Sequence, residues 1–300
     1  MATDVVGMIG LGIMGSAISA SLMRAGYKVM GYDVLPNRSR EHRRAGGAVA
    51  RNCRAVAKAG KVMVTSLPSA DALMDTATEL CKSAETGHIV IETSTLPIPV
   101  KEEARKILAA HGILLLDCTL SGTGAQARAK DLVVYASGDR KAYNRIAPVL
   151  EGFSRAHYYV GAFGAGSKMK FVANLLVAIH NVAAAEAMVL ARKSGLDLAM
   201  VLKVIADGAG NSRMFEVLGP MMVKGDYSDA TMKVQVWQKD MAIIGEFARK
   251  LDCPTPLFSA SAPIYTAAMA MGMSAQDTGS VCAVLEQMAN CRRRPARRKR

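Results

Sequence analysis

The sequence predicts an α/β protein in which a doubly wound sheet is followed by a long connecting helix and an all-α C-terminal region. Apolar, strand-like runs alternate with helical stretches through the first half of the chain, which is the rhythm of βαβ units. After about Gly166 this alternation stops, and helical patterns separated by glycine and proline breaks follow. The strand-like runs are 5–9, 27–32, 61–66, 88–92, 113–116, 132–136 and 157–160.

The first strand-like run, 5–9, leads into a glycine-rich turn and then into a helical pattern that ends at Gly26. The turn has the pattern GxGxxG and consists of Gly10, Leu11, Gly12, Ile13, Met14 and Gly15. A helix N-terminus offers unpaired N–H groups and a partial positive charge, and glycines allow a pyrophosphate to approach them closely. Strand, turn and helix in this order therefore predict a Rossmann-type sheet that binds a dinucleotide.

The second run, 27–32, ends at Asp33, eighteen residues beyond Gly15. A carboxylate near this offset can accept hydrogen bonds from both hydroxyls of an adenine ribose, and it repels a 2′-phosphate. Acidic residues also end strands as ordinary turn residues. Asp33 thus favours NAD, while Arg38 and Arg40 leave room for the phosphate of NADP.

Loops after two further runs should lie at the carboxyl edge of the sheet, where ligands bind. Leu67 and Pro68 follow the run 61–66 and form a turn that could line one side of the cofactor site. After the run 88–92, Thr95 is the predicted contact of the nicotinamide ribose. Ser94 is predicted either to touch this ribose or to cap the next helix, and capping is at least as good an interpretation.

The run 113–116 leads into a loop rich in serine, threonine and glycine. Ser121, Gly122 and Thr123 can present backbone N–H and hydroxyl donors to a carboxylate, as an anion-binding nest. The alternative is a flexible turn of the same composition.

The long helix predicted after Gly166 carries polar side chains on one face, because Lys170, Asn174, Val177 and Asn181 recur at helical spacing. At the edge of a desolvated cleft the neutral form of a lysine is favoured, which suits proton transfer near neutral pH. A surface lysine with a buried stem explains the same pattern.

The helical region contains several further local signals. Lys239 and Asp240 are adjacent on an amphipathic pattern, and since i,i+1 side chains do not face each other, one of them is expected to face a cleft. An ordinary solvated pair is the alternative. Asp197 and Ser228 are predicted N-caps, and Pro256 is predicted to open the penultimate helix.

Four motifs in order carry a resemblance to a known family: GLGIMG at 10–15, DCTLSGTGAQARAKD at 117–131, GAGSKMKFVAN at 164–174 and KD at 239–240. The sequence resembles the β-hydroxyacid dehydrogenases, which include 3-hydroxyisobutyrate dehydrogenases, tartronate semialdehyde reductases, threonate dehydrogenases and glyoxylate/succinic semialdehyde reductases. The resemblance implies a catalytic Lys170 with Asp240 supporting it. The contacts it implies for substrate or cofactor are Ser121, Gly122, Thr123, Asn174, Thr95, Lys239 and Asp240.

One departure from the family pattern bears on the substrate. The usual Pro-Val-Ser-Gly-Gly is here Thr119-Leu120-Ser121-Gly122-Thr123, so a second glycine has gained a side chain that narrows the carboxylate pocket or adds a hydroxyl donor. The segment 209–216 is similar to that of threonate-type members, which favours four-carbon sugar acids. Asn211 or Arg213 would then contact the substrate, unless Asn211 only caps a helix.

Composition excludes several classes of protein. Seven of the net +13 charges lie in 292–300, a predicted disordered tail without aromatic residues, so specific nucleic-acid binding is not expected and weak polyanion binding stays open. Six scattered cysteines without CxxC spacing predict reduced thiols and no metal site. The start of the chain lacks a basic n-region, and the apolar stretch 171–191 contains Asn, His and Glu, so neither secretion nor a membrane span is expected.

The predicted organisation is a cofactor domain at 1–163, a connecting helix at 164–192, a helical substrate and oligomerisation domain at 193–291, and the tail. The predicted function is a cytoplasmic NAD(P)-dependent oxidoreductase, with NAD favoured, for a small 3-hydroxy acid or its semialdehyde. The resemblance implies a homodimer or homotetramer. Two alternatives are an NADPH-dependent semialdehyde or glyoxylate reductase, and a non-catalytic dinucleotide-binding protein with a polyanion-binding tail. Imine reduction is disfavoured, because related imine reductases typically lack the lysine.

Overall fold

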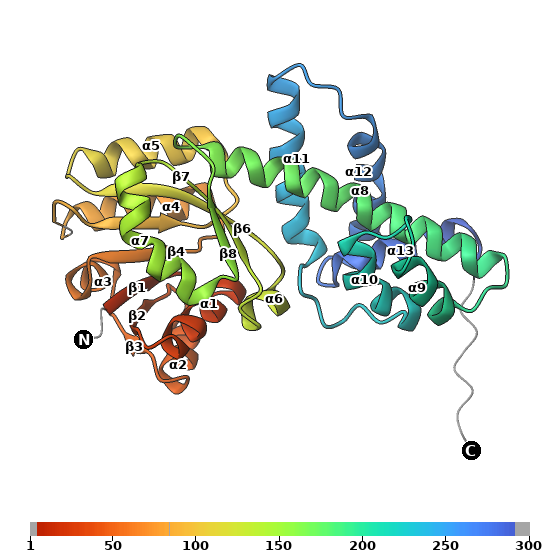
Figure 1. Ribbon diagram of the computed structural model, residues 1–300, viewed down its shortest axis with the longest axis horizontal. Helices are drawn as coiled ribbons and strands as arrows, with labels where there is room; N and C mark the ends of the chain where they lie inside the picture. The colour runs from red at the N-terminus through yellow and green to blue at the C-terminus, as the bar shows by residue number, and fades with distance from the viewer. Residues whose placement is uncertain (1–4, 84, 292–300) are drawn as a thin grey trace. The chain divides into compact units, whose positions relative to one another are not determined.

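The computed structural model describes residues 5–83 and 85–291 and divides the chain into two compact units, Met1–Phe171 and Val172–Arg300 (Figure 1). We call them the sheet unit and the helical unit. Their boundary falls inside the long helix α8 (Ala165–Lys193), whereas the sequence predicted a boundary at 163/164. The predicted tail, 292–300, lies outside the described residues.

In its described part the sheet unit is built on an eight-stranded sheet with the order β3-β2-β1-β4-β5-β6-β7-β8. The strands are β1 (Val5–Ile9), β2 (Lys28–Tyr32), β3 (Ala48–Val49), β4 (Val62–Thr65), β5 (Ile89–Glu92), β6 (Leu114–Ser121), β7 (Val133–Ser137) and β8 (Ala156–Tyr159). The order reverses between β1 and β4, as in a doubly wound sheet. This confirms the predicted fold class.

The sheet departs from the βαβ prediction at two places. The two-residue strand β3 was not predicted, because it is too short to leave a periodic signal. All neighbouring strands are parallel except β6 and β7, which are antiparallel. Only 122–132 join these two strands, with the five-residue helix α6 (Gly124–Arg128) between them, and a parallel crossover requires about a dozen residues or more.

Apolar side chains on both faces of the sheet build two cores. On β1, Met8 belongs to one core with α1 (Ile13–Arg24) and α7 (Arg140–Phe153). Its neighbour Ile9 belongs to the other core, with α3 (Cys53–Ala59), α4 (Ala70–Cys81) and α5 (Ile98–Ala109). Successive strand residues point to opposite faces, which explains the continuous apolar run at 5–9. The remaining helix, α2 (Pro36–Arg44), follows β2.

The helical unit contains, after the last part of α8, the helices α9 (Leu198–Ala206), α10 (Arg213–Lys224), α11 (Val234–Lys250), α12 (Pro256–Ala270), η1 (Thr278–Ser280) and α13 (Val281–Met288). The Asp197 side chain accepts from the N–H of Met200 and caps α9, and Pro256 opens α12, as predicted. The prediction for Ser228 is wrong, since α11 begins only at Val234. The Ser228 hydroxyl instead donates to Asp226 in the preceding loop.

Within the described residues, α8 is one helix that is long and apolar enough to cross a membrane by length and composition. Buried core helices meet the same criterion. Asn174 and Asn181 on α8 are 3% and 0% exposed, which fits a helix that packs inside protein.

Candidate active site

The glycine turn between β1 and α1 contains glycines of two kinds. Gly10 has a φ of +88°, and a Cβ there would lie 2.2 Å from the carbonyl oxygen of Ser66. A Cβ on Gly15 would lie 1.9 Å from the carbonyl oxygen of Gly10. The fold therefore requires both glycines. At Gly12, by contrast, an added Cβ would meet nothing within 4 Å.

The open space at Gly12 lies where a phosphate group would be expected. Gly12 is the N-cap of α1 and has no side chain to bond to the first N–H groups of this helix. Packing inside the protein does not explain a glycine here, whereas close approach by a pyrophosphate does. The turn thus fits the dinucleotide that the sequence predicts.

Asp33, at the end of β2, braces this turn. Its Oδ2 accepts a 2.7 Å hydrogen bond from the N–H of Leu11, and its Oδ1 accepts a 2.8 Å bond from the N–H of Leu35. The Arg38 guanidinium donates to the Leu11 carbonyl oxygen at 3.4 Å. Sequence reasoning missed this bracing role. Because each carboxylate oxygen has two lone pairs, Asp33 retains acceptor capacity for ribose hydroxyls.

The loops after β4 and β5 are joined to each other through Ser94. The N–H of Leu67, next to Pro68, donates to the Ser94 Oγ at 2.8 Å. The N–H of Ser94 donates to Oε1 of Glu92 at 2.9 Å. The expectation that Ser94 caps a helix is therefore wrong, since α5 begins only at Ile98 and its cap position, Pro97, offers no side-chain hydrogen bond. Thr95 is half-buried and follows Ser94 directly in the chain.

The predicted anion-binding loop begins later than expected, because β6 continues to Ser121. Gly122 has a φ of +131°, and a Cβ there would lie 2.7 Å from a methyl group of Leu132. Thr123 caps α6: its Oγ1 accepts from the N–H of Gln126, and its own N–H donates to the Gln126 side chain at 3.0 Å. The N–H of Thr123 is thus occupied, which corrects the nest prediction for this one donor. The Ser121 hydroxyl and the Thr123 hydroxyl proton remain suited to a carboxylate.

The first turn of α8 packs directly against the sheet. A Cβ on Gly166 would lie 2.5 Å from the Tyr135 carbonyl oxygen and 2.6 Å from that of Asp117. The Thr119 hydroxyl donates to the Gly166 carbonyl oxygen at 2.7 Å, and the N–H of Ser167 donates to Oδ2 of Asp117 at 2.7 Å. The GAGSKMK motif thus has a glycine where helix and strand backbones meet.

Lys170 lies one turn beyond this anchor. Its side chain is buried, with 9% of the residue exposed. Asp117 and Ser121 both belong to β6, so the strand that anchors α8 also leads into the predicted substrate loop. The sheet unit therefore holds Lys170 on α8, and Ser121, Thr95 and the glycine turn on strands of one sheet or on the loops that follow them.

The helical unit carries the other predicted substrate contacts. Asn174 is buried, and its Nδ2 donates to Oδ2 of Asp240 at 3.2 Å. Lys239 Nζ lies 3.3 Å from Oδ1 of Asp240. The expectation that these neighbours cannot pair is wrong, because the flexible four-carbon stem of lysine reaches back to the adjacent carboxylate. Asp240 thus orients the Asn174 amide, and its support of Lys170 stays a prediction.

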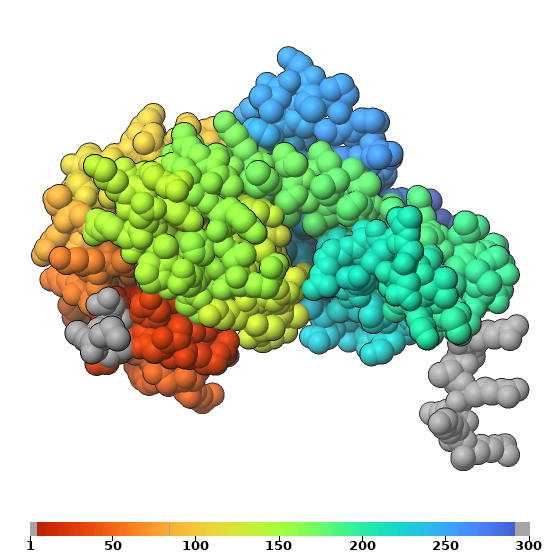
Figure 2. Space-filling view, in the orientation of Figure 1, coloured from red at the N-terminus to blue at the C-terminus, as the bar shows by residue number. Residues whose placement is uncertain are grey.

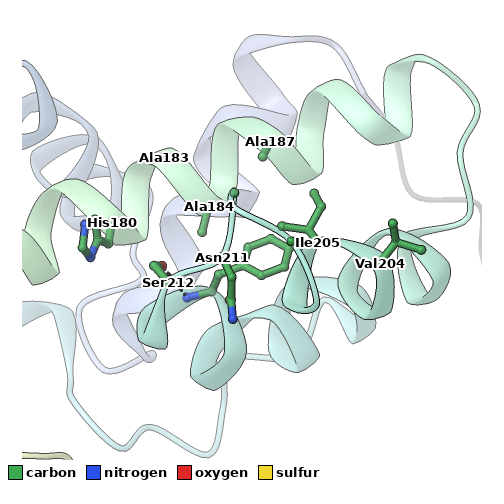
Figure 3. A pocket seen from close by; sticks show the side chains of 11 residues that line it. His180, Ala183, Ala184, Ala187, Val204, Ile205, Asn211 and Ser212 are labelled. Carbon is green, nitrogen blue, oxygen red and sulfur yellow. Dashed lines mark hydrogen bonds between the residues drawn. The ribbon is translucent and has the colours of Figure 1, made fainter.

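The helical unit also has an open groove of about 550 Å³ between α8 and the α9–α10 segment. Figure 3 shows His180, Ala183, Ala184 and Ala187 along α8, opposite Val204, Ile205, Asn211 and Ser212. The Asn211 Nδ2 donates to the Ala206 carbonyl oxygen and to Glu216, and Ser212 caps α10. Since its walls are mainly alanine, glycine, valine, isoleucine and phenylalanine residues, the groove suits an apolar side chain better than a carboxylate.

Among the described residues no group of three or more His, Cys, Asp or Glu side chains could hold a metal ion. The six cysteines, Cys53, Cys81, Cys118, Cys253, Cys282 and Cys291, carry free thiols. A glycine turn at the N-terminus of α1, an acid at the end of β2 and working loops at the carboxyl ends of the parallel strands define an NAD(P)-binding oxidoreductase.

Comparison with known proteins agrees with this class. The family model described as the NAD binding domain of 6-phosphogluconate dehydrogenase matches residues 5–161. The model described as NAD-binding of NADP-dependent 3-hydroxyisobutyrate dehydrogenase matches residues 164–285. An L-threonate dehydrogenase of Cupriavidus necator is 33% identical over 283 residues, which cover 92% of this chain and 94% of that protein.

Solved structures match over nearly the whole chain. A 3-hydroxyisobutyrate dehydrogenase of Salmonella typhimurium has a TM-score of 0.85 at 30% identity, covering 94% of this chain and 99% of its own. Psf3 in complex with NADP+ and 2-OPP has a TM-score of 0.85 at 27% identity, covering 93% and 99%. The chain belongs to the β-hydroxyacid dehydrogenase family and is an NAD(P)-dependent oxidoreductase.

Proposed function

We propose that this enzyme transfers hydride between a nicotinamide cofactor and the hydroxyl-bearing carbon of a small 3-hydroxy acid, or back to the matching semialdehyde, with Lys170 as the general acid/base. The observation that carries the proposal is the anchoring of α8 on β6. It places the buried Lys170 one turn after Ser167, which is bonded to Asp117 on β6, the strand that ends at Ser121. A buried amine and a loop of donors on neighbouring elements suit a hydroxyl and a carboxylate of one small molecule.

In the oxidation direction the neutral amine of Lys170 takes the proton of the substrate hydroxyl while hydride leaves the same carbon. In the reduction direction the protonated amine returns that proton to the developing alkoxide. Proton transfer by a positioned side chain contributes about 10²- to 10⁴-fold to a rate. The bound nicotinamide supplies the hydride acceptor or donor.

The carboxylate of the substrate is held by Ser121 and by the hydroxyl proton of Thr123. These groups fix the substrate so that its hydroxyl faces Lys170, and positioning of this kind is a large part of catalysis. Asn174, with its amide oriented by Asp240, holds the substrate hydroxyl or the lysine amine. Lys239 adds a positive charge that is neutralised in part by Asp240.

The cofactor would be held by the glycine turn, Asp33, the Leu67–Pro68 turn, Thr95 and Lys239. NAD is the proposed cofactor, because the Asp33 carboxylate would repel the 2′-phosphate of NADP. Psf3, a structural relative, binds NADP+, and Arg38 lies against the same turn. If the enzyme were to prefer NADP over NAD, it would instead be assigned as an NADPH-dependent semialdehyde reductase.

Threonate and related four-carbon sugar acids are the proposed substrates. The C. necator relative is an L-threonate dehydrogenase. Thr123 adds a hydroxyl where the family pattern has glycine, which suits a substrate with additional hydroxyl groups. In this chain Asn211 and Arg213 both bond to Glu216, so their contribution would be to shape this segment.

We also propose a cytoplasmic homodimer or homotetramer. Apolar side chains on α9 are exposed, Met200 by 57% and Val204 by 60%, and Val204 lines the apolar groove. Figure 2 shows the surface of the α9–α10 segment. A second copy that covers this surface would remove it from water. Light scattering that detects only monomer at micromolar concentration would contradict this part.

The test of the proposed function is nicotinamide absorbance on mixing the protein with NAD or NADP and a panel of acids: threonate, erythronate, 3-hydroxyisobutyrate, glycerate and 4-hydroxybutyrate. We expect turnover of one acid with NAD. The Lys170→Met variant should lose turnover and still bind NAD in calorimetry. Turnover that survives Lys170→Met would refute the role of the lysine.

A further inference from the structure

A buried cluster of charges lies behind the loops of the sheet unit. Glu92 at the end of β5, Lys101 on α5 and Asp117 on β6 are each 0% exposed. The Lys101 ammonium lies 2.5 Å from Oε2 of Glu92 and donates to Oδ1 of Asp117 at 2.8 Å. None of these three residues belongs to the predicted site.

The cluster requires an explanation beyond stability. Buried ion pairs lose hydration, and apolar replacements of similar volume are often as stable or more stable. Burial disfavours the ammonium of Lys101, but the charges of Asp117 and Glu92 outweigh this effect and hold the pKa of Lys101 above its ordinary value. The lysine thus stays charged between its two carboxylates.

Each carboxylate extends the cluster to a different part of the proposed site. On one side, Oε1 of Glu92 accepts from the N–H of Ser94, whose hydroxyl accepts from the N–H of Leu67. These are the loops that carry Thr95 and Pro68. Glu92 therefore holds the part of the sheet edge proposed to contact the nicotinamide.

On the other side, Asp117 holds the N-terminus of α8. Its Oδ2 accepts from the N–H of Ser167 at 2.7 Å, and its Oδ1 accepts from the Ser167 hydroxyl at 3.0 Å. A carboxylate is favourable at a helix N-terminus because of the unpaired N–H groups and the helix dipole. Ser167 is three residues before Lys170, so Asp117 fixes the turn from which Lys170 projects.

We propose that Lys101 is a positioning residue of the enzyme: by bridging Glu92 and Asp117 it fixes the catalytic turn of α8 relative to the loops that hold the nicotinamide. This rests on the proposed function, because it takes Lys170 as the acid/base and the loop 93–95 as the cofactor contact. Lys101 touches neither substrate nor cofactor and acts through the two carboxylates. Misplacement of reacting groups by about 1 Å can lower a rate by about 10²-fold.

Three variants separate the two arms of the cluster. Glu92→Gln leaves either Lys101 or the N–H of Ser94 without its acceptor. We expect weaker cofactor binding, by about tenfold in calorimetry, which corresponds to one lost hydrogen bond. Asp117→Asn keeps one acceptor oxygen but removes the acceptor of the Ser167 N–H or hydroxyl. We expect kcat to fall at least tenfold while the Kd of the cofactor stays within threefold.

Lys101→Met removes the ammonium that lies between Glu92 and Asp117 and leaves these two buried carboxylates without their positive partner. We expect both effects together, a lower kcat and a higher Kd, and a shifted pH dependence of kcat because the surroundings of Lys170 change. The matched control is Lys106→Met on the same helix, where the side chain is 70% exposed and its Nζ lies 3.6 Å from Oε2 of Glu103. If Lys101→Met does not fold, the other two variants, which preserve shape, carry the test.

The outcomes separate this proposal from the proposed function. One outcome is that the three cluster variants differ from Lys106→Met only in melting at lower temperatures. If their kcat, Kd and pH profile, measured below those temperatures, match those of Lys106→Met, the positioning role is overturned. If Lys170→Met retains turnover, the proposed function itself fails, whatever the cluster variants do. Loss of turnover in Lys170→Met with an unchanged Asp117→Asn would overturn only the positioning role.

Discussion

The glycine turn allows a prediction in which cofactor binding and folding respond differently to the same substitution. Gly12→Ala adds one methyl group in front of the N-terminus of α1. Its backbone, with φ of −65° and ψ of −164°, is accessible to alanine, and the new Cβ meets nothing within 4 Å. A pyrophosphate bound at this turn, as we propose, would meet this methyl group.

The expected magnitudes follow from the structure. Alanine is a poorer N-cap than glycine, which lowers the stability of the folded protein by about 1 kcal/mol. Alanine also has less conformational freedom than glycine in the unfolded chain, which raises the stability by about 0.4–1 kcal/mol. The net change in the free energy of unfolding should therefore be less than about 1 kcal/mol. Loss of one hydrogen bond to a charged phosphate removes about 1.5–3 kcal/mol, or about a tenfold to hundredfold increase in the Kd of NAD.

The assay is calorimetric titration with NAD beside thermal melting of the apoprotein, with Gly15→Ala as the matched control. In Gly15→Ala the new Cβ would lie 1.9 Å from the Gly10 carbonyl oxygen. Overpacking of this kind should lower the free energy of unfolding by about 1–3 kcal/mol or more, so this variant should melt at a lower temperature. NAD binding by Gly12→Ala at wild-type affinity would refute the assignment of the pyrophosphate to this turn.

Three further predictions concern other parts of the chain. Asp33→Ser should lower the ratio of kcat/KM with NAD to kcat/KM with NADP at least tenfold, because the charge that repels a 2′-phosphate is gone. An unchanged ratio would mean that Asp33 only holds the turn through its hydrogen bonds. Thr123→Gly should remove the side-chain cap of α6, at about a few tenths of a kcal/mol of stability, and raise the KM of threonate relative to 3-hydroxyisobutyrate. Equal changes in both KM values would exclude a hydroxyl-specific role. Burial lowers the pKa of His42 below 6.5, so the contribution of the neutral imidazole to stability is complete above pH 6.5 and is lost as pH falls through the folded-state pKa. His42→Leu should therefore reduce the fall of the melting temperature on the acid side of a pH profile. An unaltered slope would contradict this.

Much of the fold could be predicted from the sequence because its signals are local. Buried parallel strands leave apolar runs, and caps such as Asp197 act within three residues of their partner. The pairing direction of β6 and β7 depends on how far a short connection can reach, which no periodicity reveals. For the same reason Ser94 resembled a helix cap, although its partner, Leu67, comes from another loop.

The proposed site shows the same limit. The glycine turn and the lysine helix carry recognisable motifs, whereas Lys101 lies in a charged helical stretch that resembles an ordinary solvated face. Only the packing of α5 against β5 and β6 brings its ammonium to Glu92 and Asp117. A long-range ion cluster leaves no spacing in the sequence, so reasoning from local patterns could not find it.

The most direct test of the central claim compares the wild-type enzyme with Lys170→Met at saturating NAD across the acid panel, with NAD binding measured on the same samples. The account predicts turnover of one hydroxy acid by the wild type, and a loss of about 10²-fold or more in the variant at an unchanged Kd for NAD. Wild-type rates in Lys170→Met, or tight NAD binding without turnover of any acid of the panel by the wild type, would contradict it.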